Sequence, residues 1–430
     1  MLRSTCLVLT GLMTILAAGC QPGDCRHGDC KKAQTRTPGV NVRDFGAVGD
    51  GRADDTAALQ AAIDAACPIG GGALAIVPSK VVLPAGHYRI TKPLKSAPGQ
   101  KTLLLQGTGG VDCFGGSPAS NPKRVPRAAT QIIYDGPEGQ PLLDIRGMGG
   151  LQIRNLGLIG NGQCGTLLRI NAPKGFGAGR YHIENVVFAE ADTAISCGDD
   201  SYINSADMTF VSILVQRVKT GFVTHSGQNI DYCFIRPHFT FTDTCFRFEA
   251  GGNCQATMPT MVNCRRAVQI DSAGWNTGSF HFDTLHMETA RKTAYQILKA
   301  RGQCTVTFTA LSAQTQYAAR KAGDTTPLFD IGPSVMVRVQ GGQISNGPVA
   351  VMRGAARQPA WIGFENCRFF AKQPYNGDPR TTIATDDFSG YRVTDSIVTL
   401  EDPSKQRGTE EDSIFITEFS RVPEGVRTEK

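Results

Sequence analysis

The sequence has no Cys-x-x-Cys pair, only two tryptophans, and no long helical periodicity beyond residue 67. The missing cysteine pair argues against zinc ribbons and zinc fingers. The missing periodicity excludes helical repeats, and the absence of an LxxLxL motif excludes leucine-rich repeats. Charged residues make up only 19% of the chain, whereas glycine is abundant, with 49 residues. This composition favours a protein of strands and turns.

The formal net charge of the chain is modest, at +6. A weakly positive surface suits a polyanionic ligand such as an acidic polysaccharide. No nucleic-acid partner is expected.

Fourteen cysteines are a high number for 430 residues. Two of them, Cys6 and Cys20, belong to an N-terminal leader, and the other twelve indicate an oxidising compartment. They are interpreted either as disulfides in part or as buried free thiols. The second interpretation is supported by Cys233 and Cys367, which we expect at inward strand positions.

The leader reads as an export signal. Arg3 precedes an apolar run that is too short to span a membrane comfortably, and small residues follow it. Leu16–Cys20 (LAAGC) resembles a bacterial lipoprotein box, in which Cys20 is lipidated, although Ala17 stands where that pattern prefers Leu. We therefore expect an exported protein, either a bacterial outer-membrane lipoprotein anchored through Cys20 or a secreted or periplasmic protein with a cleaved signal.

The stretch from residue 40 to residue 67 predicts a strand, a glycine-rich turn and a short helix. The apolar run Val40–Phe45 begins it, and Asp54 and Asp55 offer side-chain oxygens to the free N–H groups of a helix start. The helix has one narrow apolar face, because its apolar residues are spaced i, i+3, i+4, i+7. These residues are Leu59, Ala62, Ile63 and Ala66. Together these elements would form a lid with one apolar face, and that face needs the open end of a larger structure to cover.

Two blocks of this region carry a family resemblance. They are NVRDFGAVGDGRADDTAALQAAIDAA, residues 41–66, and GGGALAIVPSKVVLPAGHYRI, residues 70–90. They resemble the N-terminal segment of pectate-lyase-like, rhamnogalacturonase-like β-helix proteins, which tailspike depolymerases also use. The resemblance implies a right-handed parallel β-helix and a carbohydrate-active role. In that family these residues mainly build the lid, so they do not assign the chemistry.

From residue 149 onward a six-residue template recurs about every 27 residues: apolar, any, small or Asn, apolar, any, apolar. A second short apolar strand follows each copy, and one degenerate copy is expected near Ala256. Asn155, Asn185, Asn366 and Asp395 share the third position, where we expect amide side chains to stack along the coil axis. The template starts at Ile153, Ile183, Phe210, Ile230, Phe282, Phe308, Val339, Phe364 and Val393.

One turn per copy would stack strand on strand, about 4.8 Å apart, around a continuous core. The predicted fold class is all-β: a single-stranded, right-handed parallel β-helix (pectin-lyase-like) of about ten coils with an N-terminal capping α-helix. A propeller is the main alternative, but its blades need about four strands per 40–50 residues. The predicted parts are a signal peptide (1–19), a linker (20–38), the β-helix (39–400, with cap and first coils in 39–110 and a loop in 111–130) and a tail (401–430).

Ligands of such coils lie outside a sheet, so outward polar residues in the middle of the coil are the candidates for a site. The expected register groups Asp231, Arg236 and His238 on one coil. It groups Asp283, His286 and Glu288 two coils later, about 10 Å away. The candidate catalytic residues are Asp231, Arg236, His238, Asp283 and Glu288. Hydrolysis would use Asp231 and Asp283 as acid and base. Elimination would use Arg236 or His238 to remove the proton alpha to a uronate carboxylate, with cations neutralising that carboxylate.

These observations predict an exported protein that acts on uronate-containing polysaccharide by elimination or hydrolysis. The alternative is a non-catalytic carbohydrate-binding or surface-adhesion protein, for which the charged residues would form a solvated face. No cofactor is assigned; an Asp-rich loop at Asp199 and Asp200 could take calcium, but no recognisable ligand spacing accompanies it. Membrane contact is expected only through a lipid at Cys20. The sequence does not decide the oligomeric state between a monomer and a trimer.

Overall fold

The structure is a computed structural model, and its description covers the residues in the following ranges. These are 39–67, 79–100, 102–111, 128–173, 177–198, 205–271, 278–289, 295–315, 326–345, 347–372, 378–401 and 413–423. The predicted signal peptide, Cys20 and the linker lie outside them. Within these ranges, no helix is long and apolar enough to cross a membrane.

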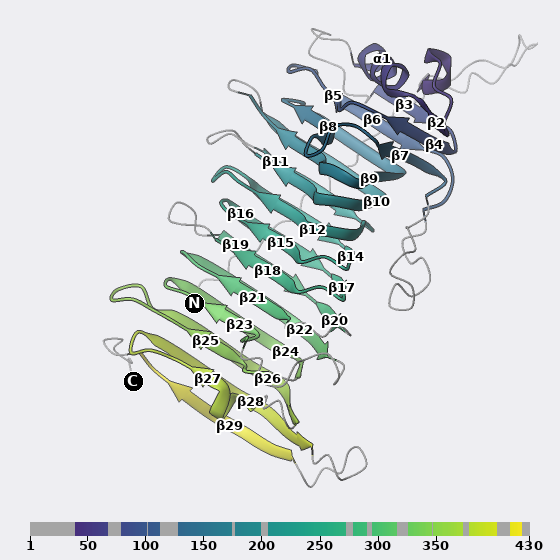
Figure 1. The fold of residues 1–430 in the computed structure, drawn as a ribbon. Helices are drawn as coiled ribbons and strands as arrows, with labels where there is room; N and C mark the ends of the chain where they lie inside the picture. Colours follow the sequence, from purple (N-terminus) through teal and green to yellow (C-terminus); the bar gives the residue numbers. More distant parts are fainter. Residues whose placement is uncertain are drawn as a thin grey trace, which may run out of the picture. The chain divides into compact units, whose positions relative to one another are not determined.

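Parallel strands stack along the chain into a coil with three faces (Figure 1). The first face contains β1 (Val40–Asn41), β3 (Ser79–Leu83), β6 (Thr102–Gly107), β9 (Gly150–Asn171), β10 (Ala178–Cys197), β11 (Ser205–Val211), β13 (Ile230–Ile235), β16 (Gly252–Thr257), β19 (Gly278–Asp283), β22 (Cys304–Thr315), β24 (Val335–Ser345), β26 (Ala360–Lys372) and β28 (Ser389–Glu401).

The long strands β9, β10, β22, β24, β26 and β28 bend from the first face onto the second. Between them, the second face contains β2 (Asp50–Asp54), β4 (Gly86–Ile90), β7 (Thr130–Tyr134), β12 (Leu214–Thr224), β14 (His238–Thr240), β17 (Thr260–Val262) and β20 (His286–Thr289).

The third face is formed by the second strand of each copy, as the sequence predicts. It contains β5 (Leu94–Lys95), β8 (Pro141–Arg146), the later parts of β9, β10 and β12, then β15 (Thr244–Phe248), β18 (Arg266–Ile270), β21 (Gln296–Ala300), β23 (Phe329–Ile331), β25 (Ala350–Met352) and β27 (Ile383–Ala384). The predicted parallel β-helix of about ten coils is confirmed.

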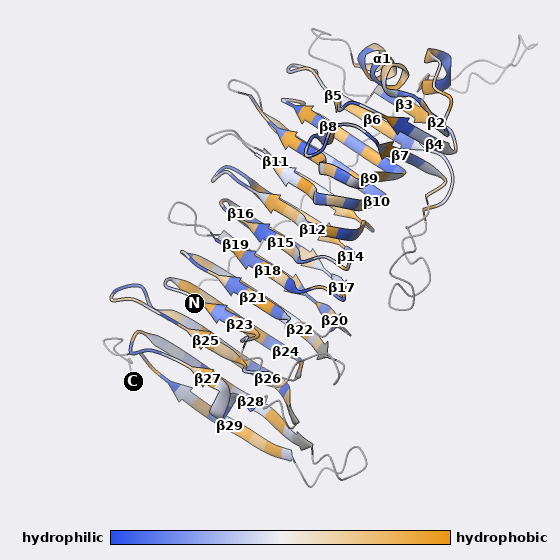
Figure 2. Cartoon of the chain, viewed as in Figure 1, coloured by the Kyte–Doolittle hydropathy of each residue, from blue (hydrophilic) through white to orange (hydrophobic). Residues whose placement is uncertain are grey.

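One apolar file runs through the core and shows why the coil is stable. Its residues pair in register from coil to coil, and each is at most 1% exposed. They are Ile153, Ile183, Phe210, Phe234, Ala256, Phe282, Phe308, Val339, Phe364 and Val393. Figure 2 shows the resulting mixture of hydrophobic and hydrophilic positions along the strands. The burial of this file is a large hydrophobic contribution that each coil gains only from its neighbours.

The predicted file is confirmed except at one coil. Phe234, not Ile230, occupies the inward position there. Ile230 lies four residues earlier in β13 and pairs with Gly252. The correct copy begins at Phe234, but its third residue is Arg236, where the template expects a small residue or Asn. The template was therefore matched to IDYCFI, which begins at Ile230. The four-residue error also misplaced Cys233, which is partly exposed instead of inward.

The third template position has a left-handed backbone in every one of these ten coils. The values of φ there are 56° for Asn155, 52° for Asn185, 50° for Ser212, 51° for Arg236, 51° for Met258, 53° for Thr284, 48° for Ala310, 70° for Gly341, 53° for Asn366 and 49° for Asp395. Asn and Asp tolerate this conformation best among residues with a Cβ, which explains their recurrence. This position forms the corner between the first and second faces, where the chain turns.

The N-terminal cap matches the prediction in its helix. Helix α1 (Thr56–Ala66) buries all four residues of its apolar face and packs against β1, β3 and β5. The run expected as a strand is extended only at Val40–Asn41; Val42–Phe45 form the 3-10 helix η1, with the Asn41 side chain accepting from the N–H of Arg43 at 3.0 Å.

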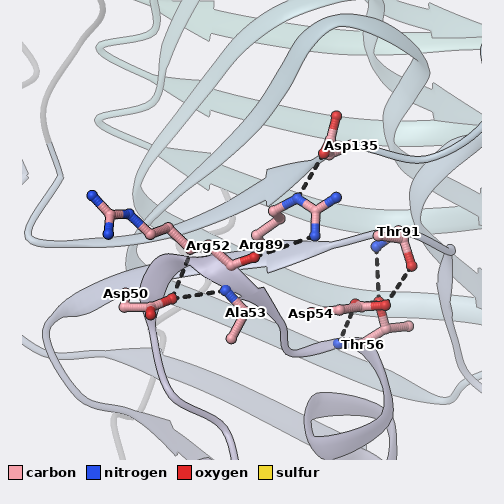
Figure 3. A network of polar contacts seen from close by, with 8 residues as sticks. All are labelled: Asp50, Arg52, Ala53, Asp54, Thr56, Arg89, Thr91 and Asp135. Carbon is pink, nitrogen blue, oxygen red and sulfur yellow. Dashed lines mark hydrogen bonds and ion pairs between the residues drawn. The ribbon is translucent and has the colours of Figure 1, made fainter.

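The two aspartates before α1 accept hydrogen bonds from different parts of the cap. Asp54 accepts from the N–H of Thr56 at 3.0 Å and from the hydroxyl of Thr91 at 2.6 Å, and Figure 3 shows this network, in which Arg89 also pairs with Asp135 at 2.6 Å. Although burial raises it, these hydrogen bonds lower the pKa of Asp54 to about 2.

Asp55 does not cap the helix with its side chain. It is 1% exposed and accepts from the N–H groups of Val48 and Gly49, at 2.6 and 3.0 Å, so it holds the glycine-rich turn against the helix.

The described cysteines are free thiols. Nine fall in these ranges, and eight of them are buried. The disulfide interpretation is therefore wrong for these nine, and the eight buried thiols pack as small apolar groups in the core. Cys25, Cys30 and Cys113 lie outside the described residues.

The two ends of the predicted loop 111–130 pack over the outside of the second face. Val111 bridges to Ala128, and Val111 adjoins an outer apolar cluster of Ile159, Val187, Ala189 and Leu214. At the other end of the coil, β29 (Ser413–Arg421) pairs antiparallel with β28. Part of the predicted C-terminal tail therefore belongs to the fold; the short helix α2 (Pro379–Thr382) precedes β27.

Candidate functional site

Four of the five predicted site residues lie at the corner between the first and second faces or on the adjoining part of the second face. Arg236 is the left-handed corner residue itself and is exposed, and His238 begins β14 two residues later. Asp283 ends β19, and Glu288 lies in β20, two coils further along the axis. Coils are about 4.8 Å apart, so the two groups are separated by about 10 Å. We call these four residues, with His286, the corner site.

Asp231 does not belong to the corner site. It lies near the start of β13, is exposed, and accepts a hydrogen bond from the Asn253 amide at 3.2 Å. Asp283 is in register with Ile235, four residues further along the strand and two coils away. Those offsets amount to about 13 Å and about 10 Å, beyond the range in which an inverting acid–base pair encloses one water. The expected placement of Asp231 was wrong because it followed the misregistered copy at Ile230.

Two histidines occupy equivalent positions in the corner site. His238 and His286 are in register with Thr260 between them. The Nδ1 of His286 lies 3.3 Å from the Ser312 hydroxyl, and its Nε2 lies 3.9 Å from Glu288 Oε2. Burial, followed by the charge of His286, lowers the pKa of His238 to about 4. The imidazole of His238 is therefore neutral near pH 7.

The corner site joins a neutral base to a cation. His238 and Arg236 are two residues apart on one coil, and the guanidinium stays charged at any physiological pH. Asp283 accepts from the hydroxyls of Thr309, at 2.6 Å, and Thr284, at 3.3 Å, so its carboxylate is fixed in place. A guanidinium can hold a carboxylate while a neutral imidazole accepts a proton.

A second polar region was missed by the sequence analysis. It runs along the outside of the third face, and we call it the third-face ladder: Asp144, Arg169, Ser196, His225, Arg247, Glu249, Asp271, Arg301 and Asp330. Most of its residues are paired by charge. Arg169 binds Asp144 at 2.8 Å, Arg247 binds Glu249 at 2.9 Å, and Arg301 binds Asp330 at 2.8 Å.

Asp144 is the most enclosed member of the ladder. Its side chain is 0% exposed, and both Arg146 and Arg169 bind it. Although burial raises it, the hydrogen bonds from Arg169 and Arg146 keep the pKa of Asp144 below its usual range. The sequence does hold a signal for the ladder, because the third residue of LLRI, CFRF and LFDI is charged in otherwise apolar strands.

No metal centre is found among the residues that the structure describes. None of their histidine, cysteine, aspartate and glutamate side chains form a group of three or more that could hold an ion. The acidic pair Asp199 and Asp200 lies outside those residues, so the calcium loop stays a prediction.

A family match lies in the N-terminal cap and first coils. Residues 39–110 match the family described as rhamnogalacturonase A/epimerase, pectate lyase-like. Mannuronan C5-epimerase AlgE5 of Azotobacter vinelandii is 61% identical over 51 residues, 12% of this chain and 4% of that protein. Alginate lyase 7 of the same organism is 57% identical over 51 residues, 12% of this chain and 5% of that protein. The matched segments span a tenth or less of the length of these curated relatives.

Solved structures align over most of the chain at low similarity. The A-module of mannuronan C-5 epimerase AlgE4 of Azotobacter vinelandii has a TM-score of 0.38 and 17% identity, covering 86% of this chain and all of that one. The Streptococcus pneumoniae surface adhesin PfbA has a TM-score of 0.45 and 14% identity, covering 81% of this chain and all of that one. The fold assignment therefore rests on the strand pairing of this chain itself. By its strand pairing the chain is a parallel β-helix protein, and its N-terminal segment, residues 39–110, matches the rhamnogalacturonase A/epimerase, pectate lyase-like family.

Proposed function

We propose that this protein acts on uronate-containing polysaccharide by removing the proton at C5, alpha to the uronate carboxylate. The observation that carries the proposal is that the exposed Arg236 and the neutral His238 lie two residues apart on one coil of the corner site. The curated relatives support the substrate class, since their names include mannuronan C5-epimerases and an alginate lyase. Their own activities belong to proteins that this chain matches only in part.

The chemistry follows from the charges. The guanidinium of Arg236 neutralises the uronate carboxylate, which makes the adjacent C5–H bond more acidic. His238 accepts the C5 proton as general base. In elimination the C5–H electron pair forms the C4–C5 double bond, the bond from C4 to the glycosidic oxygen breaks, and the imidazolium or water returns a proton to that oxygen. Returning the proton to the opposite face of C5 would instead give the epimer.

The remaining corner residues fit a binding role. Asp283 and Glu288 lie two coils from His238, about 10 Å along the axis, where a neighbouring sugar of an extended chain would lie. Their carboxylates accept hydrogen bonds from sugar hydroxyls. Hydrolysis through Asp231 and Asp283 is disfavoured by their separation. Binding without turnover, the non-catalytic alternative, is an outcome that the experiment distinguishes.

The test compares variants on defined polymers. Purified protein is incubated with polymannuronate, polyguluronate and polygalacturonate, and new double bonds are followed by ultraviolet absorbance. Arg236→Ala and His238→Gln are expected to abolish turnover. Arg180→Ala is the matched control, because Arg180 is also exposed and left-handed but lies at another edge of the coil. Equal activity of all four proteins would refute the corner site.

Export is proposed on the leader alone. The small residues before Cys20 motivate cleavage there and lipidation of Cys20, which would tether the protein to the outer membrane. Intact mass of protein from a bacterial membrane fraction should show an acylated Cys20 as the first residue. A product that begins elsewhere without an acyl chain would leave only the secretory signal.

A further inference from the structure

Three side chains of the third-face ladder form a continuous hydrogen-bond relay. The Oγ of Ser196 lies 3.1 Å from Nε2 of His225, and Nδ1 of the same imidazole lies 2.7 Å from Oε2 of Glu249. The residues come from three successive strands, the ends of β10, β12 and β15. We propose that Ser196, His225 and Glu249 are the nucleophile, general base and orienting acid of an acyl-ester hydrolase site.

The order of the contacts fits that chemistry. A carboxylate can only accept, so Glu249 fixes the proton of neutral His225 on Nδ1. Nε2 is then the nitrogen that accepts the proton of the Ser196 hydroxyl. A nucleophile, a base within hydrogen-bond reach and a third group that orients the base are the recognisable parts of such a site, whatever the fold.

The surroundings hold the relay in place. Arg247 binds the other oxygen of Glu249 at 2.9 Å and is itself bound by Asp271 at 3.2 Å. The side chains of His225 and Glu249 are 30% and 34% exposed, so the base lies at the surface. Ser196, on the preceding coil, is 5% exposed and is therefore more enclosed than either.

Cations flank the hydroxyl along the axis. Ser196 is in register with Arg169 on the preceding coil, and through Val223 with Arg247 on a later coil. Both guanidiniums are also paired with carboxylates, so what they can offer the oxyanion that develops when an acyl carbonyl is attacked is their N–H groups as hydrogen-bond donors.

The reaction balances with water as the only co-substrate. Ser196 Oγ bonds to the ester carbonyl carbon as its proton passes to Nε2 of His225. The bond from that carbon to the alcohol oxygen then breaks, and the imidazolium gives its proton to the alcohol. Water, deprotonated by His225, attacks the acyl-serine and releases the carboxylic acid and the free hydroxyl. The site is independent of the proposed uronate chemistry, because it lies on another face.

A second serine–histidine pair provides a matched control. Ser279 Oγ lies 3.0 Å from Nε2 of His281 on the outside of β19. Among the described residues, no carboxylate lies within hydrogen-bond distance of the His281 imidazole. Ser279→Ala therefore removes a comparable hydroxyl–imidazole contact without touching a complete relay.

The experiment measures hydrolysis of p-nitrophenyl acetate by the full chain and maps a serine-directed fluorophosphonate by mass spectrometry. Hydrolysis above the buffer rate and a label on Ser196 are expected. Ser196→Ala and His225→Asn should each lower kcat by about a thousandfold, Glu249→Gln should lower it less, and Ser279→Ala should leave it unchanged. Circular dichroism and melting establish that each variant is folded.

The outcomes separate the two sites. Parental hydrolysis in folded Ser196→Ala, or neither hydrolysis nor labelling in the parent, would overturn the relay as a catalytic site. Uronate turnover should persist in Ser196→Ala, and ester hydrolysis should persist in Arg236→Ala, so failure of one proposal leaves the other distinguishable.

Discussion

The amide of Asn185 donates to the amide oxygen of Asn155, 3.3 Å away on the preceding coil. Both residues are left-handed, with φ of 52° and 56°. The contact shows how one corner position serves two purposes, since Asn tolerates the turn and also links neighbouring coils through its side chain.

Substitutions at Asn185 separate these two contributions. Asn185→Ala loses the amide contact and places a Cβ in left-handed backbone, so it should lower the free energy of unfolding by about 2 kcal/mol. Asn185→Gly loses the same contact but relieves the backbone, so it should cost about 1 kcal/mol or less. Chemical denaturation measures both. If Gly is as destabilising as Ala, the left-handed corner is not what selects Asn.

The lid is tested at its apolar face. Ile63 is 2% exposed on α1, so Ile63→Asp buries an unpaired charge and should cost several kcal/mol. Ala61→Asp, on the exposed side of the same helix, introduces the same group and should cost about 0.5 kcal/mol or less. Thermal unfolding compares them. An unchanged melting temperature for Ile63→Asp would mean that the helix does not cap the coil.

Acid should weaken the fold through His238. Its folded pKa of about 4 lies below the ordinary value, so the unfolded chain binds the proton more readily. Stability is therefore fully present above about pH 6.5 and is lost as pH falls towards 4, by up to about 3 kcal/mol. Asp54 and Asp144 have lowered pKa values and titrate mainly below this window.

His238→Gln is the variant that isolates this effect. Between pH 6.5 and pH 4, its free energy of unfolding should vary less with pH than that of the parent. Denaturation curves at several pH values give the comparison. The same slope in both proteins would show that another group carries the pH dependence.

The rate of uronate turnover should follow the same imidazole. If His238 is the base, activity rises with pH through about 4 and is flat from pH 6 to pH 8. A rate that climbs steeply above pH 9 would instead indicate that a group other than His238 is the base. Initial rates on one polymer across this range distinguish the two.

The sequence was sufficient for the coil wherever a copy carried a small residue or Asn at the corner. Ile153 and Ile183 are followed by Asn155 and Asn185, and their register was predicted correctly. In the coil of Phe234 the corner residue is Arg236, a residue type that does not indicate a left-handed turn. The predicted register of that coil was therefore wrong by four residues.

The site residues were harder to predict because their proximity depends on coil length. Ser196, His225 and Glu249 are separated by unequal intervals in the sequence and meet because successive coils place them at the same end of the third face. Asp231 shows the converse, since a register error of a few residues moved a candidate to the far end of its strand.

The most direct test of the proposed function is the proton NMR spectrum of polymannuronate after incubation with the purified protein in deuterated water. We predict either loss of the C5 proton with unsaturated chain ends, for elimination, or deuterium at C5 of the epimer, for epimerisation, and neither change with His238→Gln. Polymannuronate, polyguluronate and polygalacturonate that all keep their C5 protons and chain length, while the protein still binds them, would contradict the account and favour a non-catalytic carbohydrate-binding protein.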